Sequence, residues 1–524
     1  MTGKHVSFLT QAKRLASLTL ASSALGFIRE LVIAHRFGAT HATDSYLVAL
    51  SIPTMFYAFL VGSGLNYSVV PRMTSLLERD PKHAMESFTE FLGALLSFGL
   101  AASILIFVFA PQLIRGFAPG LGSSSLTVFY ARLLAPMLFL YAATYSLASF
   151  QCARHKTAYW GLVAPTMNVV VLISIPLLAG LLGVGVLVLG TLAGLSLALL
   201  TQVILSYKAG LWHHWTRPFR GGEGTQMLRA LLPFVLVFGI GGSDGTGQVD
   251  IFLARFFASH LNSGSITLLS LANKLTALPV LLVGASLGLA VLPGASLAFS
   301  KRDNEQAASH LVQALGYVFL LIIPIAVLCL SCSSVLARLV FSRGAMRPEQ
   351  VAELGTILVA YSGAVAGAAI VYVLSGFLAA HGRTRLLIGW GVTTVIIEAC
   401  LMRFFSVRYA ARGIALSMSI GSLFYCSVLS LALLRSFGIH VSAEVGKRVF
   451  VVLTGAVVMY FVLRFMSQLA WFDSAPYLVS RVLLPVLSGL ASYGAWLALW
   501  ASFGVRVASP TSRQTLAPSL ETGI

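Results

Sequence analysis

Residues 22–53 read SSALGFIRELVIAHRFGATHATDSYLVALSIP, and this stretch decides what kind of protein the chain forms. Most of it is apolar enough for a lipid bilayer, yet it contains Arg29, Glu30 and Asp44. A charge at membrane depth is costly, so such residues usually face a watery cavity and contact a substrate, an ion or one another. The stretch therefore predicts a membrane protein whose first two helices carry a functional site.

The composition of the whole chain also favours a membrane-embedded fold. The 524 residues are 57% hydrophobic and only 10% charged, whereas a soluble domain has about 25% charged residues. The longest polar stretch, roughly residues 208–226, is too short to fold by itself. The N-terminus has no short apolar core followed by a cleavage site, so no cleaved signal peptide is expected. We predict one polytopic, all-α membrane domain.

Charge, cysteines and motifs exclude several other classes of protein. The formal net charge is +18, but the basic residues lie between apolar spans and form no single basic face, so no nucleic-acid partner is expected. The five cysteines lie in or beside apolar segments, and neither a disulfide framework nor a metal site is expected. The sequence has no HExxH motif, no P-loop and no GxSxG motif, so we predict no enzymatic activity and no cofactor.

Hydropathy predicts about fourteen transmembrane helices, because a spanning helix needs roughly 20 mainly apolar residues. They are expected near residues 13–35, 43–70, 86–110, 125–150, 157–181, 184–207, 228–258, 265–293, 308–335, 352–380, 385–405, 411–434, 448–469 and 479–503. If the N-terminus is cytoplasmic, most lysines and arginines outside the spans fall in cytoplasmic segments. Both termini are therefore expected to be cytoplasmic.

The chain contains two similar blocks that indicate an internal repeat. VGSGL at residues 61–65, leading to Pro71, resembles VGASL at 283–287, leading to Pro293, an offset of 293 − 71 = 222 residues. This offset predicts two pseudo-symmetric six-helix lobes around a central cavity, plus two C-terminal helices, as in transporters with parallel repeats. The expected parts are an N-terminal lobe at 1–207, a cytoplasmic linker at 208–226, a C-terminal lobe at 227–435, and the last two helices with a cytoplasmic tail at 436–524.

Further charged residues fall inside the predicted spans. They are Asp244, Asp250, Arg255, Lys274 and Glu398. Asp244 and Asp250 belong to the glycine-rich run GIGGSDGTGQVD, which indicates a broken or closely packed helix. We expect Arg255 to be a cation at the end of its helix.

We expect Arg29 and Lys274, one from each half, to converge on an anion. Planar guanidinium donors match phosphate geometry, and an ammonium is a compact point charge. Asp44, Asp250 or Glu30 would orient these cations or carry a coupling cation. The alternatives are structural: Arg29 neutralises Glu30 or Asp44, Lys274 extends its ammonium to the membrane interface, and Asp250 caps a helix or pairs locally.

The residues around these charges resemble one known family. The matching positions are 25–30 (LGFIRE), 37–39, 43–44 and 52–53, then 257–261, 263–265, 272–275 (ANKL), 279 and 293, with weaker matches at 118–120, 164–165 and 168. They are similar to those of the MurJ/MviN lipid II flippases of the multidrug/oligosaccharidyl-lipid/polysaccharide exporter superfamily, and the similarity spans most of residues 13–435.

The resemblance implies a bacterial inner-membrane protein with the fourteen-helix fold described above. It implies inward–outward rocking that carries an undecaprenyl-diphosphate-linked peptidoglycan precursor to the outer leaflet, driven by the membrane potential or an ion gradient. The lipid tail would lie in a groove near the last two helices. The expected partners are the lipid-linked glycan, membrane lipids, and cell-wall synthesis or division proteins.

The resemblance also assigns roles and shows departures. The family's functional arginine in helix 1 matches Arg29, its acidic residue early in helix 2 matches Asp44, and Lys274 holds the place of its helix-8 arginine. The chain has Ala24 for a second arginine, Tyr57-Ala58 for an arginine pair, Gly62-Ser63 for Glu-Gly, and Thr384-Arg385 for Thr-Pro. These departures leave open an exopolysaccharide or O-antigen repeat-unit flippase, a drug/cation antiporter and a non-transporting cell-wall scaffold.

Overall fold

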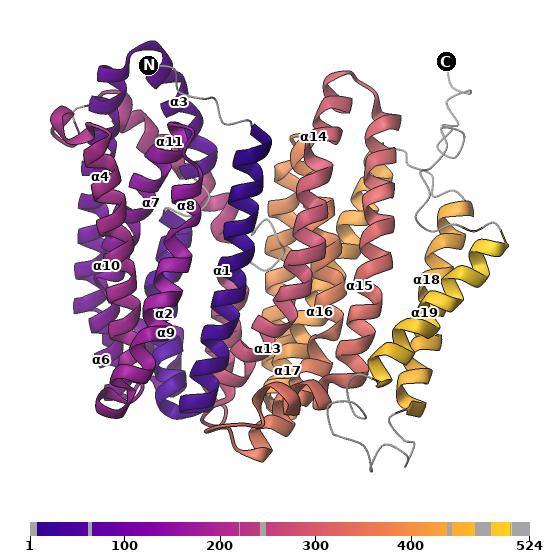
Figure 1. Cartoon of the computed structure of the whole chain (residues 1–524). Helices are drawn as coiled ribbons and strands as arrows, with labels where there is room; N and C mark the ends of the chain where they lie inside the picture. The colour runs from indigo at the N-terminus through magenta and orange to yellow at the C-terminus, as the bar shows by residue number, and fades with distance from the viewer. Residues whose placement is uncertain are drawn as a thin grey trace. The chain divides into compact units, whose positions relative to one another are not determined.

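The computed structural model describes residues 8–60, 65–219, 221–240, 248–437, 443–466, 484–503 and 505, and every regular element in these ranges is helical (Figure 1). The first half holds α1 (Phe8–Phe37), α2 (His41–Leu60), η1 (Leu65–Val69), α3 (Val70–Arg79), α4 (Pro81–Val108), α5 (Ala110–Phe117), η2 (Pro119–Leu121), α6 (Ser125–Leu134), α7 (Met137–Ala153), α8 (Ala158–Gly161), α9 (Val163–Leu182), α10 (Gly185–Lys208), η3 (Leu211–His214) and α11 (Glu223–Ile240). The second half holds α12 (Gln248–Ala258), α13 (Ser265–Pro279), η4 (Val280–Ala285), α14 (Ser286–Ser300), α15 (Asn304–Phe341), α16 (Pro348–Ala380), α17 (Thr384–Phe437), α18 (Ala443–Met466) and α19 (Leu484–Ser502). The prediction of an all-α membrane protein is confirmed.

Ten helical segments of the described chain are long and apolar enough to cross a membrane. Each of the fourteen predicted ranges overlaps a described helix, but α1, α2 and the pair α11 and α12 do not meet this criterion. The predicted spans at 385–405 and 411–434 both lie in α17, where Ala410 leaves the helical conformation with φ 49° and ψ −134°. The fourteen-span topology therefore stays a prediction.

Several helices begin where the sequence supplies a cap. At the start of α4, the Asp80 carboxylate accepts hydrogen bonds from the Lys82 and His83 amides at 3.0 and 3.1 Å. At the start of α15, the Asp303 carboxylate accepts from the Gln306 amide at 2.8 Å. The first amides of a helix lack an acceptor within it, so an acidic side chain at this position fixes where the helix starts.

The two repeat blocks each overlap a π-helical segment. In the first block this segment is η1, at residues 65–69, and in the second it is η4, at residues 280–285. π-helical turns are rare and are often found at functional sites in membrane and soluble helices. The first part of the first block, residues 61–64, lies outside the described residues, and the repeat itself stays a prediction.

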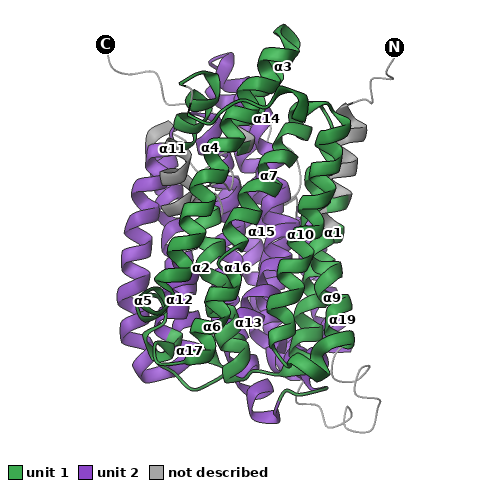
Figure 2. Cartoon of the chain, turned by 90° about the vertical axis from the view of Figure 1, so that its left-hand side faces the viewer, with its two compact units in different colours: residues 1–239, 258–267, 344–346 green, residues 240–257, 268–343, 347–524 purple. Residues whose placement is uncertain are grey.

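The chain divides into two compact units (Figure 2). Unit 1 comprises residues 1–239, 258–267 and 344–346, and unit 2 comprises 240–257, 268–343 and 347–524. In unit 1, α9 packs on α10, α4 on α7 and α2 on α6, around a core that contains Phe88, Phe91 and Phe150. The predicted boundaries at residues 207, 226 and 435 are not tested by this division.

Unit 2 is built around α16, which packs against α14, α15 and α17. Its core contains Phe377, Leu374 and Ile322, all buried. The last two helices, α18 and α19, pack against each other, and α18 also packs against α15. Small residues such as Ala369 and Gly284 allow the close approach of η4 to α16 that membrane helices commonly use.

Candidate functional site

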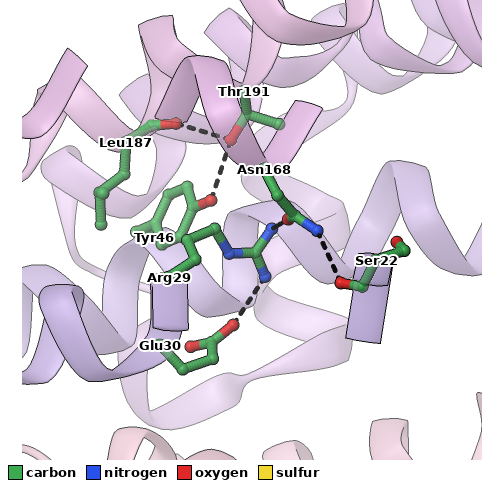
Figure 3. Close-up of polar contacts among 7 residues, drawn as sticks. All are labelled: Ser22, Arg29, Glu30, Tyr46, Asn168, Leu187 and Thr191. Atoms are coloured by element: carbon green, nitrogen blue, oxygen red, sulfur yellow. Dashed lines mark hydrogen bonds and ion pairs between the residues drawn. The ribbon is translucent and has the colours of Figure 1, made fainter. Parts of the chain in front are cut away.

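Arg29 belongs to a hydrogen-bonded group of polar residues from α1 and α9 of unit 1 (Figure 3). Its Nη2 donates to Glu30 Oε1 at 2.6 Å, and its Nη1 donates to Asn168 Oδ1 at 2.9 Å. Asn168 Nδ2 in turn donates to the Ser22 carbonyl at 3.3 Å. The third guanidinium nitrogen, Nε, is buried and donates to no atom of the described residues. Arg29 is therefore ion-paired, as the structural alternative predicted, yet it retains one unused donor.

A second hydrogen-bonded chain adjoins Arg29 and comes from α2 and α10. The Tyr46 hydroxyl lies 3.0 Å from Thr191 Oγ1, and Thr191 Oγ1 donates to the Leu187 carbonyl at 2.7 Å (Figure 3). Because Thr191 gives its single proton to Leu187, Tyr46 must be the donor to Thr191. Four helices of unit 1 thus contribute to the polar surroundings of Arg29.

Asp44 is buried in unit 1, where its carboxylate caps the first turn of α13. Its Oδ2 accepts from the Gly264 amide at 2.6 Å. Its Oδ1 accepts from the Thr267 amide at 2.8 Å and from the Thr267 hydroxyl at 2.6 Å. Both carboxylate oxygens are therefore occupied, and a negative charge at a helix N-terminus is favourable. Asp44 holds two segments 220 residues apart in the sequence, and it does not contact Arg29 in any hydrogen bond of the described residues.

A tight turn brings the two segments together. Gly264 has φ +95°, and a Cβ at this position would lie 2.6 Å from the Ala39 carbonyl oxygen. Only glycine adopts this conformation without strain while allowing the backbone so close. Nearby, the Ala345 amide donates to the His35 carbonyl at 2.8 Å. The turn between α1 and α2 is therefore tied to two later segments of unit 1.

Two acidic side chains meet in unit 2, beside a cavity of about 170 Å³. Asp250 from α12 and Glu398 from α17 both line it and are each 3% exposed, so two acidic side chains border the same small space. The other polar lining comes from Asn273, Thr276, Tyr361 and Ser422, among others. The sequence predicted Asp250 as a site residue, and the structure places a second acid, Glu398, at the same cavity.

Glu398 was noted in the sequence as an intramembrane charge but was not placed in the predicted site. Its Oε2 is buried and has no hydrogen-bond partner among the described residues. Opposite it, in the other half of α17, stands Gly421, where any Cβ would collide with the Glu398 carboxyl. Glu398 and Gly421 lie next to each other only because the chain turns at Ala410, so the sequence alone gave little indication of their contact.

Residues 33–480 match the family described as lipid II flippase MurJ, which is most of the chain. The chain belongs to the MurJ family. Its relatives include a lipid II flippase MurJ of Burkholderia cenocepacia, 25% identical over 84% of this chain and 86% of that protein. A probable lipid II flippase MurJ of Rhizobium tropici is 24% identical over 86% of this chain and 85% of its own length. This protein is therefore a multi-pass membrane protein of a transporter family, not an enzyme.

Solved structures show that the fold is that of MurJ and of its wider superfamily. A lipid II flippase MurJ in an inward closed conformation superposes with a TM-score of 0.78 at 18% identity, covering 94% of this chain and 99% of that chain. An inward-facing MATE multidrug transporter of the MOP superfamily superposes with a TM-score of 0.65 at 13% identity, covering 82% of this chain and 98% of that one. The predicted resemblance to the MurJ family is confirmed.

For the remaining intramembrane charges of this MurJ family member, the structure gives the positions of Lys274 and Arg255 but not that of Asp244. Lys274 is an exposed residue of α13 in unit 2, whereas Arg29 belongs to unit 1, so their convergence on an anion stays a prediction. Arg255 lies in the last turn of α12, as expected for a helix-end cation. Asp244 lies outside the described residues.

Tyr57, one of the departures from the MurJ pattern, packs in a group of aromatic side chains. Tyr57, at the place of a family arginine, stacks on Tyr141 with ring centroids 4.4 Å apart and lies 5.0 Å from the Tyr145 ring. Tyr145 also makes an edge-on contact with Trp160. Aromatic packing between α2 and α7 thus occupies the place where the resemblance implies a positive charge.

Proposed function

We propose that this protein moves lipid II, the undecaprenyl-diphosphate-linked peptidoglycan precursor, from the inner to the outer leaflet of the bacterial cytoplasmic membrane. Membership of the MurJ family supports this assignment, since its relatives carry the name lipid II flippase. The observation that carries it is Arg29, a half-buried arginine in a predicted membrane helix whose buried Nε retains an unused donor. Such a residue is costly to keep in a membrane unless it binds something.

The proposed mechanism is alternating access. Fourteen spans would form two six-helix lobes around a central cavity, with two more helices at the C-terminus and both termini in the cytoplasm. Arg29 and Lys274 would bind the diphosphate from opposite lobes, with Glu30 keeping the guanidinium oriented through its 2.6 Å ion pair. The membrane potential or an ion gradient would drive the cycle, and no cofactor would be needed. Membrane lipids and cell-wall synthesis or division proteins are the proposed partners.

Complementation in a strain depleted of its own flippase tests the role of Arg29. Arg29→Ala should abolish growth and leave lipid II in the inner leaflet, because the diphosphate loses its guanidinium donors. Arg36→Ala is the matched control, since Arg36 is an exposed residue in the last turn of the same helix and should be dispensable. If Arg29→Ala still supports growth at normal protein levels, the proposed anion site is wrong.

Lys274 gives a second test, in the other unit. Lys274→Ala should abolish transport, and Lys274→Arg should preserve it because the family resemblance places an arginine there. Both variants should reach the membrane in normal amounts, which immunoblotting of membrane fractions checks. A dead Lys274→Arg variant that inserts normally would contradict the alignment of this helix with the family.

A second candidate is a flippase for another polyprenyl-diphosphate glycan, such as an exopolysaccharide or O-antigen repeat unit. The aromatic packing of Tyr57 on Tyr141, in place of a family arginine, favours it. Lipid analysis after depletion separates the two candidates. Accumulation of lipid II supports the first, whereas accumulation of a different lipid-linked glycan with normal lipid II supports the second.

A further inference from the structure

The turn of α17 at Ala410 carries three arginines, Arg403, Arg408 and Arg412, which we call the turn patch. All three are exposed. None of them forms an ion pair with an acid of the described residues, and the sequence has no Asp or Glu between residues 399 and 443. Because arginine stays protonated in proteins, the described part of the chain leaves the charge of this patch uncompensated.

The first half of α17 has an exposed apolar stripe that runs to the turn patch. Its members are Ile396, Cys400, Phe404 and Val407, all exposed, with Phe404 at 66% and Val407 at 75%. Residues three and four apart share one face of a helix, so these side chains form a continuous row. With a rise of 1.5 Å per residue, the row is about 16 Å long. This length is close to the roughly 15 Å that one leaflet contributes to the hydrocarbon core.

The charges lie at one end of the stripe. Arg403 and Arg408 flank it on its two sides, because successive residues of an α-helix are about 100° apart around the axis. Tyr409 lies at the same end, 45% exposed, with its ring 6.0 Å from that of Phe405. Tyrosine is enriched at the level of the lipid headgroups, and arginine near a helix end extends its guanidinium to that level. Cationic groups at the end of an apolar row match the layout of a phospholipid, whose phosphate lies at the end of its acyl chains.

The stripe also favours a lipid over an acidic protein as the occupant. An acidic polypeptide would complement the arginines, but it would leave the apolar row uncovered. Much of this row lies in the predicted span at 385–405, where acyl chains are the surrounding medium. A phospholipid with a net negative charge complements both parts at once.

We propose that the turn patch binds the phosphate of an anionic phospholipid whose acyl chains lie along the exposed stripe of α17. The guanidinium groups of Arg403, Arg408 and Arg412 donate hydrogen bonds to the phosphate oxygens, a geometry that arginine matches well. This phospholipid is a resident of the bilayer and not the transported substrate. The inference therefore goes beyond the proposed function and does not depend on it.

Mass spectrometry of the intact, purified full chain in detergent, titrated with phosphatidylglycerol, tests this site. The wild-type protein should bind phosphatidylglycerol more tightly than phosphatidylcholine. The combined variant Arg403→Gln/Arg408→Gln/Arg412→Gln should bind phosphatidylglycerol at least about tenfold more weakly, since each basic residue near an anionic lipid contributes about a fivefold gain. The combined Arg→Lys variant at the same positions should retain most of the binding because it keeps the charges, and it decides the matter if the glutamine variant does not fold.

A second triple variant is the matched control. Arg79→Gln/Arg115→Gln/Arg217→Gln removes the same charge from exposed positions elsewhere in the chain, and it should bind phosphatidylglycerol as the wild type does. Equal weakening in both glutamine variants would mean that only net charge matters, and this result overturns the proposal. Loss of binding in the lysine variant, while the protein stays folded, also overturns it.

The choice of lipid tests the two parts of the site separately. Equal binding of phosphatidylglycerol and phosphatidylcholine by the wild type would contradict the role of the turn patch. Short-chain phosphatidylglycerol should bind more weakly than the long-chain lipid, because it covers less of the stripe, and equal binding would contradict the role of the stripe. If polyglutamate binds through the three arginines and phosphatidylglycerol does not, the patch takes an acidic protein and the lipid assignment is wrong.

Discussion

Asp44 and Glu398 are the same kind of group in the same degree of burial, but their surroundings differ. Each is 3% exposed in a helical membrane protein. Asp44 accepts three hydrogen bonds, two of them from backbone amides at the start of α13. Glu398 lines the same cavity as another acid, Asp250, and its Oε2 has no partner among the described residues.

The difference shows what decides the role of an acid inside a membrane. Where backbone amides donate hydrogen bonds to the carboxylate and so offset the cost of burying its charge, the carboxylate stays in place and links two segments of the fold, as at Asp44. Where the neighbouring side chain is a second acid, as at Glu398, two ionised carboxylates repel each other and rarely ionise together. The sequence alone shows two acids in apolar segments and does not show which donors face them.

Asp44→Ala should give the largest loss of stability. It would leave the Gly264 amide, the Thr267 amide and the Thr267 hydroxyl without their acceptor, and each buried unsatisfied group costs about 1–3 kcal/mol. We expect a total loss of at least about 3 kcal/mol, seen as a lower midpoint in thermal unfolding of the purified protein.

Asp80→Ala is the control for Asp44→Ala. Asp80 also caps a helix with its carboxylate, but it is exposed, so water can replace it. Its loss should cost about 1 kcal/mol. Equal losses for the two variants would contradict the structural role assigned to burial at Asp44.

Much of the fold can be predicted from the sequence, because membrane helices are recognisable by their length and hydropathy. The ranges predicted for the helices all overlap described helices, and the caps at Asp80 and Asp303 explain where two of them start. The turn in α17 was also anticipated, because the predicted spans stop at 405 and resume at 411, on either side of Ala410. The predicted spans in α1 and α2 are not among the ten helical segments that are long and apolar enough to cross a membrane.

The site was only partly predictable, because contacts between distant segments do not appear in a linear pattern. The charges at Arg29, Asp44 and Asp250 were identified as costly and therefore informative. The ion pair of Arg29 with Glu30 was one of the structural alternatives that the sequence left open. The cap that Asp44 gives to Gly264 was not, because it joins residues 220 apart and depends on a glycine with φ +95°.

Gly264→Ala should lower the stability by less than Asp44→Ala does. It tests the same contact between Asp44 and the start of α13, but changes the other partner. Alanine at φ +95° is strained, and its Cβ would lie 2.6 Å from the Ala39 carbonyl oxygen. A left-handed backbone costs a non-glycine residue about 1–2 kcal/mol, and the collision adds to this. Gly210→Ala is the control, since Gly210 also has a left-handed backbone but nothing lies within 4 Å of an added Cβ. The control should therefore lose less stability in the same unfolding measurement.

Glu398→Gln should change stability by less than about 1 kcal/mol, since replacing a buried ionisable group by a neutral one of similar shape is often neutral. The glutamine amide can donate a hydrogen bond to the Asp250 carboxylate, so a polar contact between α12 and α17 remains possible. Thermal unfolding should therefore separate this variant clearly from Asp44→Ala. A loss of stability as large as that of Asp44→Ala would mean that Glu398, like Asp44, has a structural role.

The smallest effect should come from a titratable group outside the spanning helices, where solvent reaches it. His381 lies between α16 and α17, with its ring centroid 4.5 Å from that of Phe299. Partial burial, and then the charge of Arg383, lower the pKa of His381 from its usual 6.5. The unfolded chain therefore binds the proton more readily, so stability should fall slightly as the pH drops through this usual value and should not change above it. His381→Gln should flatten this slope in unfolding midpoints measured between about pH 5 and 8, whereas an unchanged slope would assign it to other groups.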